Sequence, residues 1–145
     1  MDIYSKTITT GKVILAVSIL LTLTACKQNL TLSDANNVIV GNGTLEVSAN
    51  SPSPVKISID GKEFSGTWSA TKVYEEDVAK RHRLISTRSY DAYMQGNTPD
   101  QLRHGRAVLA AQDGTELTCD FYYRGQPKAG ECNIDGKELK LRLSD

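Results

Sequence analysis

The stretch of sequence that decides the fold runs from residue 113 to residue 143 and reads DGTELTCDFYYRGQPKAGECNIDGKELKLRL. Apolar and polar residues alternate through most of it, which is typical of β-strands that bury one face. Asp-Gly pairs at 113–114 and 135–136 favour tight hairpin turns, because a type I′ turn needs a positive φ at both central residues. The stretch therefore predicts consecutive antiparallel hairpins.

The two cysteines of this stretch support one register for the hairpins. If residues 124–127 form a loop, Cys119 lies opposite Cys132. The flanking Asp-Gly turns independently assign both cysteines to the inward face. We therefore expect a Cys119–Cys132 disulfide across the middle hairpin. The same register places Gly130 opposite Phe121, where the ring can lie over the glycine backbone.

Hairpin signals extend on both sides of this stretch. A two-residue turn at Asp113-Gly114 places Val108 opposite Cys119, which predicts a four-stranded meander from about residue 105 to residue 143. A third Asp-Gly pair, at 60–61, places Ile57 opposite Phe64. The string Ile-Asp-Gly-Lys-Glu occurs at both 59–63 and 134–138, either through duplication or because favourable hairpin chemistry arose twice.

A charged segment from residue 73 to residue 104 interrupts the strand pattern. Thr98-Pro99-Asp100-Gln101 has the form of a capping box with proline at the first helical position, which predicts a short helix up to Leu102. Residues 75–83 fit either another short helix or a wide hairpin end. The fold expected is all-β, a small antiparallel meander closing toward a barrel or sandwich, with one or two short inserted helices.

The N-terminus has the three parts of an export signal. Lys6 and Lys12 precede an uncharged apolar run over 13–23, which is shorter than the ~20 residues of a membrane-spanning helix. Leu23-Thr24-Ala25-Cys26 follows and resembles the lipobox of bacterial lipoprotein precursors. That resemblance implies a signal peptide over 1–25 and cleavage after Ala25. Cys26 then becomes the new N-terminus and carries lipid, including palmitate.

The resemblance also implies a place in the cell. A lysine at position 27, instead of the aspartate that marks inner-membrane retention in enterobacteria, implies an outer-membrane lipoprotein facing the periplasm. Residues 26–37 are polar without a sustained apolar period, so we expect a lipidated N-terminus and flexible tether there. Residues 38–145 are then a single β-rich domain, with 73–104 as an irregular insertion.

Composition limits the possible partners. Lipidation of Cys26 would leave an even pair of cysteines in an oxidising compartment, where disulfides persist. Without Lys6, Lys12 and Asp2, residues 26–145 carry 15 basic and 16 acidic side chains. A nearly neutral domain gives no electrostatic basis for nucleic-acid binding. The expected partners are the membrane, through the lipid, and an envelope protein, peptidoglycan or an anionic glycolipid.

Candidate binding residues gather in and beside the insertion, because arginine binds phosphate and carboxylate groups in bidentate fashion. They are Lys80, Arg81, Arg83, Arg88, Arg103 and Arg106. Tyr122 is a candidate aromatic surface residue on an outward strand face. The two histidines, His82 and His104, are expected to face solvent in a charged segment. No catalytic, metal-binding or cofactor-binding motif is recognised.

The function expected is non-enzymatic binding or scaffolding by a membrane-anchored envelope lipoprotein. The lipobox, small size, alternating strands and C-terminal cysteine pair resemble the small β-rich lipoproteins that inhibit host lysozyme. An inhibitor of a cell-wall hydrolase is therefore one alternative, although that family's serine-rich inhibitory loop is absent and no residue is carried over. A small envelope hydrolase, with its site around His82 or His104, is the other alternative.

Overall fold

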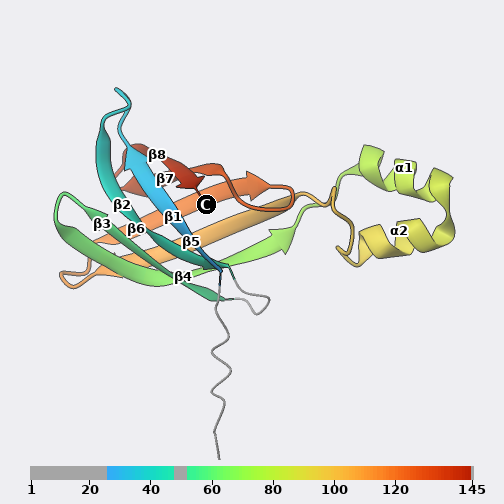
Figure 1. Cartoon of the computed structure of the whole chain (residues 1–145), viewed down its shortest axis with the longest axis horizontal. Helices are drawn as coiled ribbons and strands as arrows, with labels where there is room; N and C mark the ends of the chain where they lie inside the picture. The colour runs from blue at the N-terminus through green and yellow to red at the C-terminus, as the bar shows by residue number, and fades with distance from the viewer. Residues whose placement is uncertain (1–25, 48–51, 145) are drawn as a thin grey trace, which may run out of the picture.

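The structure is a computed structural model and describes residues 26–47 and 52–144. The chain is mostly antiparallel strand, with two helices inserted between the fourth and fifth strands (Figure 1). In chain order the elements are β1 Cys26–Ser33, β2 Ile39–Val47, β3 Ser53–Ile59, β4 Lys62–Lys72, α1 Glu76–Ile85, α2 Thr87–Met94, β5 Arg103–Ala111, β6 Glu116–Tyr123, β7 Ala129–Ile134 and β8 Lys137–Ser144. The all-β class is confirmed.

The eight strands form a closed barrel in sequential order. Each strand pairs with the next one in the chain, and β1 completes the ring by pairing with β8, Leu30 opposite Leu143 and Leu32 opposite Leu141. Closure removes the two unpaired edges that an open meander of these strands would expose to other chains. The expected meander therefore closes as a barrel, not as a sandwich.

The barrel interior is a packed core. Alternate residues along the strands point inward, and an eight-stranded barrel is just wide enough for side chains to fill. Large inward side chains from different strands meet there, such as Trp68 on β4 and Phe121 on β6, whose ring centroids lie 5.4 Å apart. The Trp68 indole donates a hydrogen bond to the Glu46 carbonyl oxygen at 2.9 Å. The wall is thus a rigid support on which surface elements are held.

Two of the three predicted Asp-Gly turns are confirmed as two-residue turns. Asp60 and Asp135 both have φ of 49°, and the glycine that follows each also has a positive φ, as a type I′ turn requires. The repeated Ile-Asp-Gly-Lys-Glu string therefore forms the same structure twice. Ile57 lies opposite Phe64 across the first of these turns, as expected.

The turn at Asp113-Gly114 was predicted wrongly. Only Gly114 has a positive φ, of 86°, and the Ala111 N–H donates to the Thr115 carbonyl oxygen across a three-residue loop. The additional loop residue shifts the register by one, so Ala107 and not Val108 lies opposite Cys119. A three-residue hairpin with glycine in the left-handed position is the other common use of this dipeptide.

The register between β6 and β7 is confirmed. Cys119 lies opposite Cys132, and their sulfurs are at disulfide distance, 2.01 Å apart. Gly130 does approach Phe121, but a Cβ there would meet the Phe121 Cβ and backbone. The Phe121 ring instead lies over Gly105 on the other neighbouring strand, where a Cβ would stand 2.3 Å from ring atom Cε2.

The expected flexible tether over 26–37 is wrong for most of its length. Residues Cys26–Ser33 form β1, which is paired on both sides, with β2 and with β8. Gln28, Leu30 and Leu32 point into the core. This alternation covers too few residues to be recognised as a strand in an otherwise polar segment. The expected signal peptide over 1–25 lies outside the described residues.

The insertion is helical. Residues 76–83 belong to α1, with Glu75 as its N-cap, which settles the choice between a helix and a hairpin end. The helix expected at 99–102 is wrong, since those residues form a turn. The second helix instead begins after Ser86, whose hydroxyl accepts a hydrogen bond from the Ser89 N–H. His104 and Arg103 belong to β5, so the insertion is shorter than the 73–104 expected.

Candidate functional site

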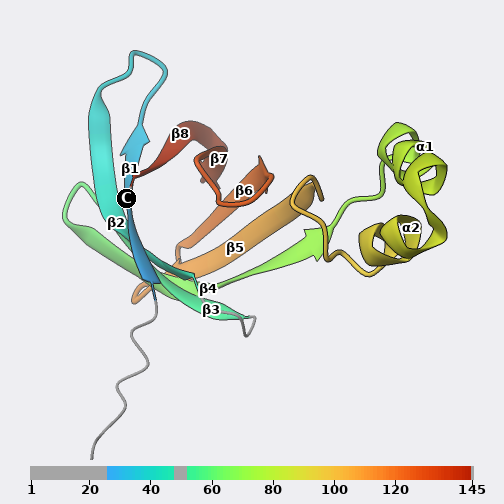
Figure 2. The same cartoon turned by 45° about the vertical axis from the view of Figure 1, so that its right-hand side comes forward.

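The two ends of the barrel differ in what they carry. Because the strands alternate in direction, the hairpin loops β1–β2, β3–β4, β5–β6 and β7–β8 all lie at one end. The other end carries Cys26, the long connection between β4 and β5, the β6–β7 loop and the end of β8. Residues 73–102, which we call the helical arm, project from this end with α1 and α2 side by side (Figures 1 and 2).

A set of polar contacts fixes the base of the arm to the barrel. The Val73 N–H donates to the Leu102 carbonyl oxygen at 2.8 Å, which continues the β4–β5 pairing by one step. The buried Gln101 amide donates to the carbonyl oxygens of Val73 and Leu102 at 2.8 and 3.0 Å. Arg103 donates to the Gly96 carbonyl oxygen at 2.9 Å. The arm therefore leaves the barrel in a defined direction.

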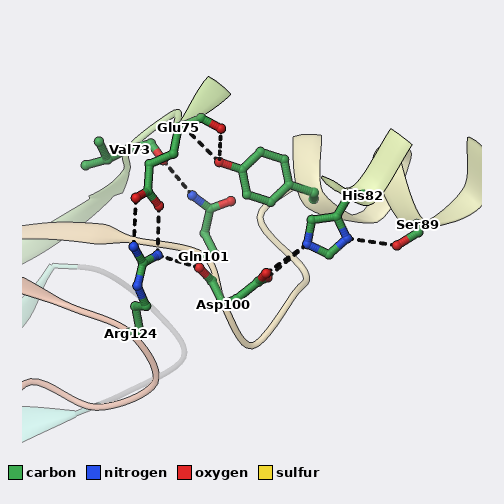
Figure 3. Close-up of polar contacts among 8 residues, drawn as sticks. Val73, Glu75, His82, Ser89, Asp100, Gln101 and Arg124 are labelled. Atoms are coloured by element: carbon green, nitrogen blue, oxygen red, sulfur yellow. Dashed lines mark hydrogen bonds and ion pairs between the residues drawn. The ribbon is translucent and has the colours of Figure 1, made fainter. Parts of the chain in front are cut away.

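A bidentate ion pair connects the arm to the β6–β7 loop. The two terminal nitrogens of Arg124 donate to the two carboxylate oxygens of Glu75, both at 2.7 Å (Figure 3). The same guanidinium donates to the Asp100 carbonyl oxygen at 2.6 Å. The hydrogen bond from Arg124 lowers the pKa of Glu75, and the hydrogen bond to Glu75 raises the pKa of Arg124.

A hydrogen-bonded chain of three side chains lies inside the arm (Figure 3). Nδ1 of His82 lies 2.8 Å from the Ser89 hydroxyl, and Nε2 lies 3.0 Å from both carboxylate oxygens of Asp100. The His82 ring stacks on Tyr93 with centroids 5.1 Å apart, and only 12% of its side chain is exposed. The expectation that His82 faces solvent is therefore wrong.

Serine, histidine and aspartate in this order are also the components of a nucleophilic hydrolase site. Burial acts to raise the pKa of Asp100, but hydrogen bonds, including the one from His82, outweigh it and lower the pKa. An ionised Asp100 holds the ring in place. The Ser89 N–H, however, is already bound to the Ser86 hydroxyl at 3.1 Å and is not free to stabilise an oxyanion. The chain of contacts ties α1, α2 and the turn at 98–102 together.

The predicted cationic residues do not form one cluster. Lys80, Arg81, Arg83 and Arg88 lie on the arm, whereas Arg103 and Arg106 lie on β5. Arg103 is engaged at the base of the arm, and Arg106 lies 3.7 Å from Asp120 on the outer barrel wall. Four of the six therefore belong to the arm and two to the barrel wall.

The end of the arm carries an exposed apolar pair that the sequence analysis did not single out. We call residues 84–87, where α1 ends and α2 begins, the arm tip. Leu84 is 88% exposed and Ile85 is 70% exposed. Leu84 lies on the opposite face of α1 from the buried Val78 and Ala79, so the helical period contained the signal.

Tyr122 lies on the outer wall of the barrel, as predicted. It is 62% exposed and stacks on His104, with ring centroids 4.6 Å apart. His104 Nε2 lies 2.8 Å from a carboxylate oxygen of Asp120. This group is a cross-strand contact between β5 and β6, and its mixed charges do not favour one class of ligand.

Cys26, the predicted lipidation site, is the first residue of β1, and its thiol is free and exposed. Among residues 26–47 and 52–144, no helix has the length and apolar character needed to cross a bilayer. Over the same ranges, no group of three or more His, Cys, Asp or Glu side chains gathers as a metal site.

Comparison of the chain with protein-family models, curated proteins and solved structures finds no match. The fold and the site therefore define the class of protein by themselves. It is a closed eight-stranded antiparallel barrel that carries a two-helix arm at the end where Cys26 lies.

Proposed function

We propose that this protein is a lipid-anchored envelope lipoprotein in which the barrel is the support and the helical arm is a non-enzymatic binding element. The observation that carries this proposal is the position of the arm. It projects from the Cys26 end of the barrel and exposes Leu84 and Ile85, which follow Arg81 and Arg83 in the chain. Binding residues are disproportionately held on segments that a rigid scaffold positions.

The packing of the barrel supports the same division of roles. Its inward residues are committed to the core, and its outer wall mixes acids and bases, such as Asp120 and Arg106. The arm is fixed at its base by Gln101 and by the Glu75–Arg124 pair, so little of its order would have to be gained on binding.

Lipid labelling tests the anchor. The parent chain, expressed in a bacterium with the lipoprotein pathway, should incorporate labelled palmitate and lose residues 1–25. The Cys26→Ser variant should incorporate none and remain an unprocessed precursor. Equal labelling of the two chains would contradict the proposal. Cys119→Ser with Cys132→Ser is the matched control, because it removes the other thiols and should leave labelling intact.

A chain without the arm tests the role of the arm. Lys72 and Arg103 are opposite each other across β4 and β5, so residues 73–102 can be replaced by an Asn-Gly turn that closes the hairpin directly. The shortened chain should fold and remain lipidated, but it should lose the contacts that the parent makes in the envelope beyond its lipid anchor. Retention of those contacts would assign binding to the barrel wall.

A projecting arm also favours an inhibitor of a cell-wall hydrolase, which needs an element that enters a target cleft. In that case the parent chain should reduce lysozyme activity in a stoichiometric titration, and the shortened chain should not. A lysozyme activity that the parent leaves unchanged excludes lysozyme as the target.

The Ser89–His82–Asp100 chain favours a small envelope hydrolase as a further candidate. A serine-directed fluorophosphonate should then label the parent and not Ser89→Ala, with Ser65→Ala as the control on the barrel. Absence of labelling in the folded parent excludes this candidate.

A further inference from the structure

The arm tip combines two features that belong to a membrane interface. Its apolar pair is the end of α1, and Leu84 is the most exposed large hydrophobic residue in the described part of the chain. Residues 80–90 carry four lysine or arginine side chains and no aspartate or glutamate. The acidic residues of α1, Glu76 and Asp77, lie in its first turn, toward the barrel.

Most of this positive charge is available to a ligand. Lys80 pairs with Glu76 at 2.8 Å on the surface. Among the carboxylates of residues 26–47 and 52–144, none lies within ion-pair distance of Arg83 or Arg88, whereas Arg81 is near enough to Glu75 for its charge to lower the pKa of that carboxyl. Arg83 lies over the Tyr90 ring, 4.6 Å from its centroid, and donates to the Tyr90 hydroxyl at 3.0 Å, which holds a guanidinium beside the tip.

Exposed aliphatic side chains near cations and a tyrosine in the sequence of the arm match the boundary between headgroups and acyl chains. Helices that lie in this boundary bury apolar residues and keep lysine and arginine near anionic headgroups. Tyrosine is favoured at the same level, because its ring is apolar and its hydroxyl polar. A water-filled periplasm offers no comparable partner for Leu84 and Ile85 unless a protein groove covers them.

Cys26 and the arm belong to the same end of the barrel. β1 begins at Cys26 itself and is paired with β2 from that residue, so no flexible segment separates an acylated Cys26 from the barrel. A lipid on Cys26 would hold this end of the barrel at the bilayer surface, and the arm leaves from the same end. Ile39, which is 67% exposed, lies at the opposite end and would face away.

We propose that the arm tip inserts Leu84 and Ile85 into the anionic phospholipid surface to which Cys26 is anchored, with Arg81, Arg83 and Arg88 on the lipid phosphates. This inference rests on the proposed function for the anchor. The arm and the lipid then form two attachment points on the same bilayer.

The test uses the full chain purified from cells and reconstituted into vesicles of phosphatidylcholine, with or without phosphatidylglycerol. An environment-sensitive fluorophore is attached to Ile85→Cys or, as the matched control, to Ile39→Cys, and bromine-labelled lipids report contact with the acyl region. The Ile85 label should shift to the blue and be quenched in vesicles that contain phosphatidylglycerol. The Ile39 label should do neither.

Charge removal gives the second readout. Changing Arg81, Arg83 and Arg88 together to glutamine should lower the equilibrium constant for insertion by about a hundredfold, at about fivefold per cation. An Ile85 label that stays in water on both kinds of vesicle overturns the inference, as does insertion that is unchanged by the three glutamines.

Failure of the anchor is separately visible. The parent chain without an added cysteine should take no label, because Cys26 is acylated and the other two thiols are joined. Labelling of the parent would contradict the proposed anchor, while the response of the Ile85 label to phosphatidylglycerol would still decide the role of the arm.

Discussion

The contact between Gly105 and the Phe121 ring leads to a quantitative prediction about stability. A Cβ at position 105 would stand 2.3, 2.6 and 2.8 Å from three ring atoms of Phe121. Phe121 is 1% exposed and packs against Trp68, so the ring has no free volume into which it can turn. Overpacking of this kind costs about 1–3 kcal/mol. Alanine also restricts the unfolded chain, which offsets ~0.4–1 kcal/mol.

We therefore expect Gly105→Ala to lower the free energy of unfolding by roughly 1–2 kcal/mol. Thermal unfolding followed by circular dichroism should show a midpoint lower by roughly 4–8 °C. Phe121→Leu removes the ring atoms concerned, so Gly105→Ala should be nearly neutral in that background. A double-mutant cycle measures this coupling directly. Equal effects of Gly105→Ala in both backgrounds would refute the packing that we describe.

Three further predictions concern the Cys119–Cys132 disulfide and the arm. Changing Cys119 and Cys132 to alanine should cost ~3 kcal/mol in chemical denaturation, as expected for the short loop that the bond closes, and an unchanged midpoint would contradict this. Because the pKa of Glu75 is lowered in the folded chain, its pairing stabilises the arm above the ordinary glutamate range and is lost as the pH falls through the folded pKa. The protection of the arm against hydrogen exchange, taken relative to the intrinsic exchange rate at each pH, should therefore fall on acidification, and Arg124→Gln should remove that change. Replacing residues 73–102 with Asn-Gly should leave the barrel cooperative, because the core contains no arm residue, and loss of the unfolding transition would contradict this.

The parts of the fold that follow from local patterns could be predicted. The alternation of apolar residues and the Asp-Gly turns were enough to predict the inward faces of β6 to β8 and the pairing of the two cysteines. A register shifted by one residue would turn every side chain of a strand to the other face, so few registers fit the pattern. The error at Asp113-Gly114 arose because this dipeptide fits both two-residue and three-residue hairpins. The flanking residues of β5, which are mostly apolar on both faces, could not distinguish the two.

The parts that depend on distant contacts could not be predicted. β1 has only three inward residues, and its second partner is β8, at the other end of the chain. Nothing local distinguishes such a strand from a polar tether. The candidate site was found only in part for the same reason. Its arginines were visible in the sequence, but the Glu75–Arg124 pair depends on how the arm meets the β6–β7 loop, and the burial of His82 depends on how the arm folds back on itself.

The central claim, that the arm meets the partner of a lipid-anchored barrel, is tested most directly by photo-crosslinking in intact cells. A photoreactive amino acid replaces Leu84 on the arm tip or, as the control of similar exposure, Ile39 at the opposite end. The account predicts strong crosslinks from position 84 to envelope components and weak ones from position 39, with both reduced by Cys26→Ser. Crosslinks from position 39 that equal or exceed those from position 84 would contradict it.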